Sequence, residues 1–222
     1  MSLSAQAVAE RLDDVRRRVA RNGGDPARIR IVAVTKGFGA SAVEAARSAG
    51  LIDMGENYAQ ELLSKAPDVP QGTVWHFLGP IQRNKVSRLA SRVSVWHAID
   101  RLGAAQAVAA ASPGSEVMVQ VNVVGDPSRP GCAPGSVAGL VEQVRALPLD
   151  LSGLMAVAPA ADPDRARESF RWLARTGRQL GLRELSMGMS DDFETAVAEG
   201  ATTLRLGRVL FGPRPKSTTV QR

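Results

Sequence analysis

Eight short runs of apolar, mostly β-branched residues alternate with helix-like segments, and this alternation limits the fold more than any other feature of the sequence. The runs cover residues 29–36, 51–57, 74–79, 93–99, 116–123, 149–157, 185–189 and 202–206. Strands separated by helices indicate parallel pairing, and eight of them suit a closed sheet better than an open one, because closure removes the sheet edges. We therefore predict an α/β fold of the (β/α)8 TIM-barrel type.

An additional helix is predicted before the first strand. Val8, Leu12, Val15 and Val19 lie four, three and four residues apart, which places them on one stripe of a helix. This helix either covers the bottom of the barrel or completes its outer ring of helices. The basic tract 16–18 lies off the stripe, so we expect it to face solvent. Residues 1–222 are expected to form a single barrel domain, with 213–222 as a flexible tail.

Composition narrows the functional classes. The sequence has no apolar run of membrane-spanning length and a polar start, and Cys132 is its single cysteine, so we predict a cytoplasmic protein without a membrane partner or disulfides. The net charge is +6, but the arginines are spread along the chain and aromatic residues are only 4%, which disfavours nucleic acid. We expect a monomer.

Two histidines and the cysteine invite functional interpretations. His76 and His97 are isolated in sequence, without other ligands at metal-binding spacing, so no metal site is predicted and core or supporting roles are favoured. Cys132 lies in the Gly- and Pro-rich stretch 125–135, where we expect partial exposure and no redox role. This stretch is long enough to form a lid over a functional site, but it is equally compatible with a surface loop that has no functional role.

The first predicted strand ends on a lysine, Lys36, which is followed by Gly-Phe-Gly. The carboxyl ends of parallel strands are where barrels carry their functional groups. Burial at that edge would lower the pKa of the amine, as a Schiff-base nucleophile requires. The alternative is a lysine that extends its ammonium to water.

Two later loops resemble a phosphate site. In TIM barrels, phosphate is commonly bound by the loops after strands seven and eight, which here span 186–192 and 205–208. The first loop leads into a helix whose amino end offers unpaired N–H groups, and the second offers Gly207 and an arginine. A capping box at 191–194 would satisfy those N–H groups without any ligand. Because strand one neighbours strand eight in a barrel, a lysine beside a phosphate cradle suggests pyridoxal 5'-phosphate.

Several motifs then carry a specific resemblance. These are Ala33-Val34-Thr35-Lys36, Gly55-Glu56-Asn57-Tyr58-Ala59-Gln60-Glu61, Trp75-His76-Phe77-Leu78-Gly79, Gln82-Arg83-Asn84-Lys85, Gly153-Leu154-Met155-Ala156, Leu185-Ser186-Met187-Gly188-Met189-Ser190 and Arg205-Leu206-Gly207. In order and spacing the chain resembles the pyridoxal phosphate homeostasis protein family, single-barrel relatives of the alanine racemase amino-terminal domain.

The resemblance implies a set of residues that bind the cofactor. Lys36 would carry the imine, Arg205 would face the pyridine nitrogen, and Ser190, Gly207 and Arg208 would bind phosphate, with Asn57 and Met187 completing the set. Arg208 stands where the family often has threonine, and Pro80 where it often has histidine.

The function implied is to hold pyridoxal 5'-phosphate as a lysine Schiff base for intracellular homeostasis, with little or no amino-acid turnover. Such a role implies transient contact with the apoenzymes that use the cofactor. The alternative is a racemase or lyase that uses the same imine. A racemase requires a second proton-transfer group, which in alanine racemase is a tyrosine completed by a second domain for which this chain leaves no residues. The single tyrosine, Tyr58, is expected to pack or to face solvent.

Overall fold

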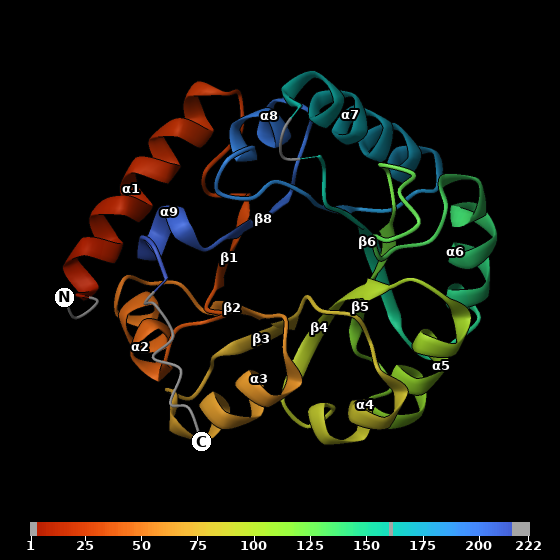
Figure 1. The fold of residues 1–222 in the computed structure, drawn as a ribbon, viewed down its shortest axis with the longest axis horizontal. Coiled ribbons are helices and arrows are strands. Elements are labelled where there is room, and N and C mark those ends of the chain that lie inside the picture. The colour runs from red at the N-terminus through yellow and green to blue at the C-terminus, as the bar shows by residue number, and fades with distance from the viewer. Residues whose placement is uncertain (1–3, 160–161, 215–222) are drawn as a thin grey trace.

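The computed structural model describes residues 4–159 and 162–214, and its eight strands close into one parallel barrel in sequence order (Figure 1). The strands are β1 (Arg30–Val34), β2 (Asp53–Glu56), β3 (Val74–Phe77), β4 (Val93–Ile99), β5 (Glu116–Val121), β6 (Asp150–Ala156), β7 (Glu184–Ser186) and β8 (Thr203–Leu206). The prediction of a (β/α)8 barrel is confirmed. The expected tail at 213–222 falls largely on residues 215–222, which lie outside the described residues.

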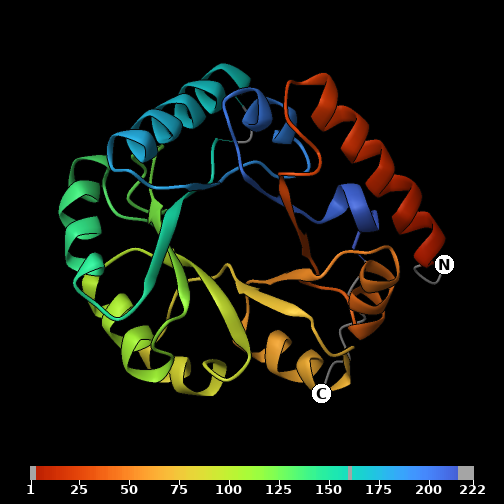
Figure 2. The same ribbon diagram turned by 180° about the vertical axis from the view of Figure 1, so that it is seen from behind.

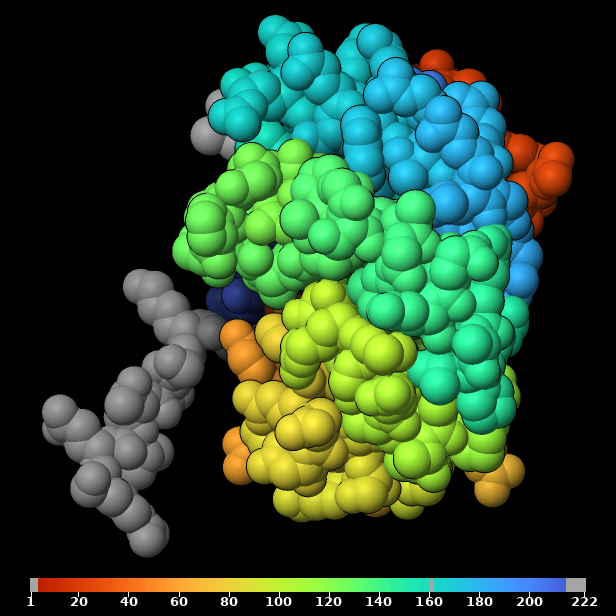
Figure 3. Space-filling model, turned by 90° about the vertical axis from the view of Figure 1, so that its right-hand side faces the viewer, coloured from red at the N-terminus to blue at the C-terminus, as the bar shows by residue number. Residues whose placement is uncertain are grey.

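Helices follow the strands and form the outer layer. They are α2 (Ala40–Ser48), α3 (Ala59–Lys65), α4 (Arg83–Leu89), α5 (Leu102–Ala111), α6 (Val137–Arg145), α7 (Pro163–Gln179), α8 (Phe193–Ala198) and α9 (Arg208–Phe211), with short 3-10 turns at Ala66–Asp68 and Pro134–Ser136. Figure 3 shows α5, α6 and α7 side by side over one flank of the barrel. The start of α7 follows the sequence signal, because Asp162 accepts a hydrogen bond from the Arg165 amide at 3.0 Å and Pro163 is the first helical residue.

The predicted N-terminal helix, α1 (Ala5–Arg21), belongs to the outer ring. It packs against α2, α8 and α9, and Figures 1 and 2 show it alongside the barrel wall rather than across an end. Its stripe of Val8, Leu12, Val15 and Val19 is fully buried, as predicted. Because α9 is a single turn, α1 supplies the cover that this part of β1 and β8 needs.

The basic tract on α1 is only partly solvated. Arg18 bonds to Glu194 of α8 at 2.9 Å and lies 4.5 Å from the centre of the Phe193 ring. Its expected partner Asp14 is also in reach, at 3.7 Å. Arg18 therefore joins α1 to α8, whereas Arg16 and Arg17 are exposed as expected.

No helix in the described part of the chain is long and apolar enough to cross a membrane.

Candidate functional site

Barrel closure brings the first and last strands together at the rim where the predicted site residues lie. β1 and β8 pair in parallel, with Val32 opposite Arg205 and Ala33 opposite Leu206. A Cβ atom on Gly207 would lie 3.2 Å from the carbonyl oxygen of Val34, so glycine is the residue that best fits this close approach. Lys36, two residues after β1, and Gly207, one residue after β8, therefore lie at the same edge of the sheet.

Lys36 lies half-buried in the turn after β1. Its pKa is lowered from the ordinary value, first because burial disfavours the ammonium and then because Arg214 and Arg205 carry like charge. Glu56 and Glu61 oppose this shift. The result is an amine with easier access to its neutral, nucleophilic form.

A buried ion pair fixes the backbone that carries Lys36. Lys65, at the end of α3, donates to Glu56 Oε1 at 2.6 Å and to the carbonyl oxygen of Thr35 at 2.8 Å. The Thr35 hydroxyl also donates to Glu56 Oε1, at 2.6 Å. The residue before Lys36 is thus held through both its carbonyl and its side chain.

The residue after Lys36 is held from α3 as well. The Gly37 amide donates to Glu61 Oε2 at 2.8 Å, and the same carboxylate oxygen accepts from Lys65 at 3.2 Å. Gly37 has a φ of +76°, a conformation that disfavours any side chain. These contacts give the Lys36 turn a single, supported conformation.

Burial also perturbs Glu56. Its pKa is raised, first by desolvation, and the hydrogen bonds from Lys65 and Thr35 oppose that rise. Its second oxygen, Oε2, is buried without a hydrogen-bond partner among the described residues. Glu56 is therefore a carboxylate that depends on Lys65 for its charge.

The loops after β7 and β8, for which the sequence predicts a phosphate cradle, contact each other. The Val209 amide donates to Ser190 Oγ at 3.2 Å, and the exposed Arg208 side chain pairs with Asp191. The capping box considered at 191–194 does not form, because Asp191 pairs with Arg208 and the capping residue of α8 is Asp192, whose carboxylate accepts from the Met189 amide at 2.6 Å. Glu194 pairs instead with α1, which leaves the start of α8 without a side-chain cap.

Arg205 lies inside the barrel, 5% exposed. Its guanidinium donates to Ser186 Oγ at 2.7 Å and to the carbonyl oxygen of Ala156 at 2.8 Å. Burial lowers the pKa of Arg205 to about 10, which still leaves it charged at neutral pH. The group is a positively charged donor held at two points.

The other two predicted residues flank this rim. Asn57 follows β2 and is half-buried, one residue beyond Glu56. Met187 follows β7 and is fully buried, with its amide bonded to the carbonyl oxygen of Thr203.

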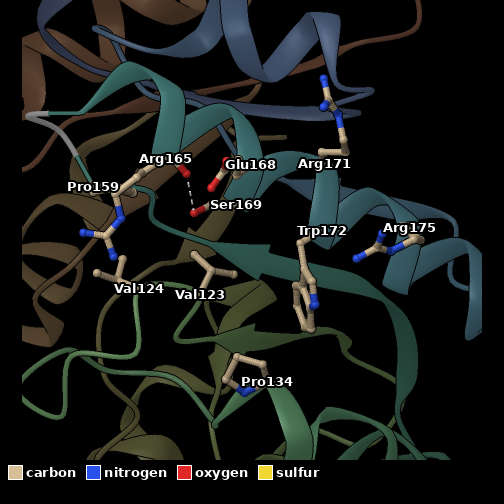
Figure 4. Close-up of a pocket in the computed structure, with 10 residues that line it drawn as sticks. All are labelled: Val123, Val124, Pro134, Pro159, Arg165, Glu168, Ser169, Arg171, Trp172 and Arg175. Atoms are coloured by element: carbon tan, nitrogen blue, oxygen red, sulfur yellow. Dashed lines mark hydrogen bonds between the residues drawn. The ribbon is translucent and has the colours of Figure 1, made fainter.

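Two cavities open near the carboxyl ends of β5 and β6. One of about 260 Å³ is bordered by Gln120, Asn122, Ala158 and Met189, the residue that precedes Ser190. The other, of about 430 Å³, lies against α7, where Trp172 extends toward Pro134 (Figure 4). None of the seven predicted site residues lines either cavity.

One expectation about a single residue is wrong, and another gains a spatial contact that the sequence did not indicate. Cys132 is 9% exposed rather than partly exposed, because it pairs with Val121 as an isolated β-bridge, and burial raises the pKa of its thiol to about 11. His76 and His97 are isolated in sequence but not in space: their ring nitrogens lie 2.8 Å apart in the barrel interior. The supporting role favoured for them agrees with this burial.

The Glu56–Lys65–Glu61 cluster was not predicted as part of the site. Glu56 and Glu61 occur in the Gly55–Glu61 motif, but their link to Lys65 depends on how α3 packs against β2. A usable signal was Glu56 at the carboxyl end of β2, since a buried carboxylate requires a partner.

Comparisons with known proteins agree with this geometry. Residues 3–215 match the family model described as "Alanine racemase, N-terminal domain". The pyridoxal phosphate homeostasis protein of Pseudomonas aeruginosa is 43% identical over 96% of this chain and 97% of its own length.

Solved structures are also similar to this chain. PipY of Synechococcus elongatus, determined with pyridoxal phosphate bound, is 32% identical, with a TM-score of 0.77 over 92% of this chain and 100% of its own. Alanine racemase from Corynebacterium glutamicum shares the fold, with a TM-score of 0.70 at 18% identity over 99% of this chain and 64% of its own.

We predict that Lys65→Met lowers the free energy of unfolding by about 3–5 kcal/mol at neutral pH, because it leaves Glu56 buried without its counter-ion. The matched change Glu61→Gln, at a partly exposed carboxylate that keeps an acceptor oxygen, should cost less than about 1 kcal/mol. Urea denaturation monitored by circular dichroism provides the measurement. Equal losses in the two variants would contradict the buried ion pair.

The loss in Lys65→Met should depend on pH. When the pKa of a carboxyl group is higher in the folded than in the unfolded protein, its contribution to the free energy of unfolding is fully present at pH values below the unfolded-state pKa. That contribution is lost as the pH rises through the folded-state pKa. Without Lys65 the pKa of Glu56 rises further, so the destabilisation should be smallest near about pH 4 and grow toward about pH 8.

Proposed function

This chain belongs to the pyridoxal phosphate homeostasis proteins of the alanine racemase N-terminal domain family, and from that premise we propose that it holds pyridoxal 5'-phosphate through Lys36 with little or no amino-acid turnover. The observation that carries the proposal is the half-buried Lys36, whose pKa is lowered, on the same rim as Gly207 and Ser190. The protein would then store the cofactor and deliver it through transient contacts with recipient apoenzymes. We propose that the protein acts as a cytoplasmic monomer.

The residues present suit this cofactor. An aldehyde requires a neutral amine, and the environment of Lys36 favours that form. A phosphate requires close backbone approach and positive charge, for which the site offers Gly207, the Ser190 hydroxyl and Arg208. Arg208 currently pairs with Asp191, so binding a phosphate would exchange one anionic partner for another.

Lys36 would hold the cofactor by condensing with its aldehyde and releasing water, a link that hydrolysis would reverse. The Thr35 and Gly37 contacts to α3 hold the backbone that carries Lys36, which reduces the conformational entropy lost on binding. Asn57 and Met187 are assigned to the walls of the site.

Arg205 is the reason to expect little turnover. When bound, the cofactor supplies an electron-withdrawing ring, which is strongest when its nitrogen is protonated. Arg205 can only donate, so facing that nitrogen it would keep the nitrogen unprotonated and the ring a weak electron sink.

The tyrosine of this chain also argues against racemase chemistry. Racemisation requires a proton-transfer group on each face of the substrate, and Lys36 supplies at most one of them. Tyr58 precedes α3 and is 61% exposed, so it faces solvent as expected.

Lys36→Ala should abolish the visible imine absorbance of the protein mixed with pyridoxal 5'-phosphate, while the far-ultraviolet circular dichroism stays unchanged, because a turn lysine contributes little to the core. Lys85→Ala, at an exposed lysine on α4, is the matched control and should retain the band. A folded Lys36→Ala protein with an unchanged band would refute the assignment.

Ser190→Ala and Gly207→Val should weaken retention of the cofactor. The first removes a hydrogen bond to a charged acceptor, worth on the order of tenfold in the dissociation constant. The second places a side chain against the carbonyl oxygen of Val34. Pyridoxal lacking its phosphate should bind the unaltered protein poorly. Equal affinity for both vitamers, measured by absorbance titration, would eliminate the phosphate cradle.

A further inference from the structure

Five polar side chains from five strands form an unbroken chain of hydrogen bonds through the barrel interior. The links join Asp53 Oδ1 to His76 Nε2 at 2.8 Å, His76 Nδ1 to His97 Nε2 at 2.8 Å, His97 Nδ1 to Ser186 Oγ at 2.9 Å, and Ser186 Oγ to Arg205 at 2.7 Å. His76, His97 and Ser186 are fully buried, whereas the side chain of Asp53, the first residue of β2, is 20% exposed. The chain therefore runs from the amino end of the barrel wall to the arginine at the candidate site.

With both imidazole rings neutral, the two ends of this chain determine the direction of every hydrogen bond in it. A guanidinium can only donate, so Ser186 Oγ accepts from Arg205, and an ionised carboxylate can only accept, so His76 Nε2 carries a proton toward Asp53. A neutral imidazole has one donor and one acceptor. His76 Nδ1 must then accept from His97 Nε2–H, and His97 Nδ1 must accept the Ser186 hydroxyl proton.

The surroundings keep His97 neutral. Its pKa is well below the ordinary value, first because it is fully buried and then because His76, Arg205 and Arg30 would add like charge. Arg30 is itself paired with Glu116 of β5, at 3.2 Å, and Glu184 of β7 accepts from the hydroxyls of Thr202 and Thr203. The nearby carboxylates are therefore engaged elsewhere.

We infer that Ser186, His97 and His76 form a directed relay that fixes the guanidinium of Arg205, and that they are positioning residues for whatever Arg205 faces. The inference that this partner is the pyridine nitrogen of the cofactor rests on the proposed function. Because Ser186 gives its own proton to His97, its oxygen is a better acceptor for Arg205. With Ala156 as the second anchor, the plane of the guanidinium is set before any ligand arrives.

The relay predicts one tautomer for each histidine, which nitrogen-15 NMR measures on the cofactor-free protein. Both rings should be neutral near pH 7, with the proton on Nε2 and an unprotonated Nδ1. A proton on Nδ1 of either ring, or a doubly protonated ring, would overturn the directed relay. This measurement does not depend on cofactor binding, so it stands even if no imine forms and the proposed function fails.

Two buried serines provide a matched pair of variants. Ser186→Ala breaks the relay, whereas Ser152→Ala removes a hydroxyl in β6 whose one hydrogen bond among the described residues is to the carbonyl oxygen of Val117, at 3.4 Å. Ser186→Ala should change the His97 nitrogen signals and raise the dissociation constant for pyridoxal 5'-phosphate about tenfold. Ser152→Ala should leave the His97 signals unchanged and the constant within about twofold.

A wild-type His97 spectrum in folded Ser186→Ala would contradict the relay. A dissociation constant that rises equally in both variants would contradict the positioning role, because it would indicate a general packing effect. If Ser186→Ala does not fold, the tautomers of the unaltered protein still decide the direction of the relay.

Discussion

The pairing of β1 with β8 is the constraint on which the candidate site depends. It joins the first strand, which carries Lys36 beyond its end, to the last, which carries Arg205 and is followed by Gly207. Neither end of the chain holds a complete site by itself. A parallel sheet places the carboxyl ends of all its strands on one rim, so closing the barrel brings together the amine, the guanidinium and the loops proposed to bind phosphate.

The polar groups buried around this rim are tolerated because they are bonded to one another. Glu56 and Lys65 would each be costly to bury alone, and together they hold the backbone on the amino side of Lys36. Inside the barrel, where branched apolar side chains are usual, His76 and His97 are each bonded at both ring nitrogens. One network positions the turn that carries the amine, and the other positions the arginine.

Sequence periodicity was sufficient to predict the barrel, since each strand and helix has its own apolar pattern, and the end of the first strand indicated Lys36. The buried networks could not be predicted in the same way. The contact between His76 and His97 depends on the irregular register between β3 and β4, and the contact between Glu56 and Lys65 depends on helix packing. Local signals also failed where tertiary contacts competed: Glu194 pairs with Arg18 instead of capping α8, and Cys132 is buried by a bridge to Val121.

The central claim is that this barrel binds the cofactor in a site that suppresses amino-acid chemistry. Exchange of the α-proton for deuterium, followed by NMR over a panel of amino acids with the cofactor-loaded protein, tests it most directly. The account predicts exchange no faster than with free cofactor, because Arg205 keeps the ring a weak electron sink and Tyr58 lies in solvent. Exchange on the order of 1 per second or faster, lost in Lys36→Ala, would contradict it and establish an enzyme of the racemase type.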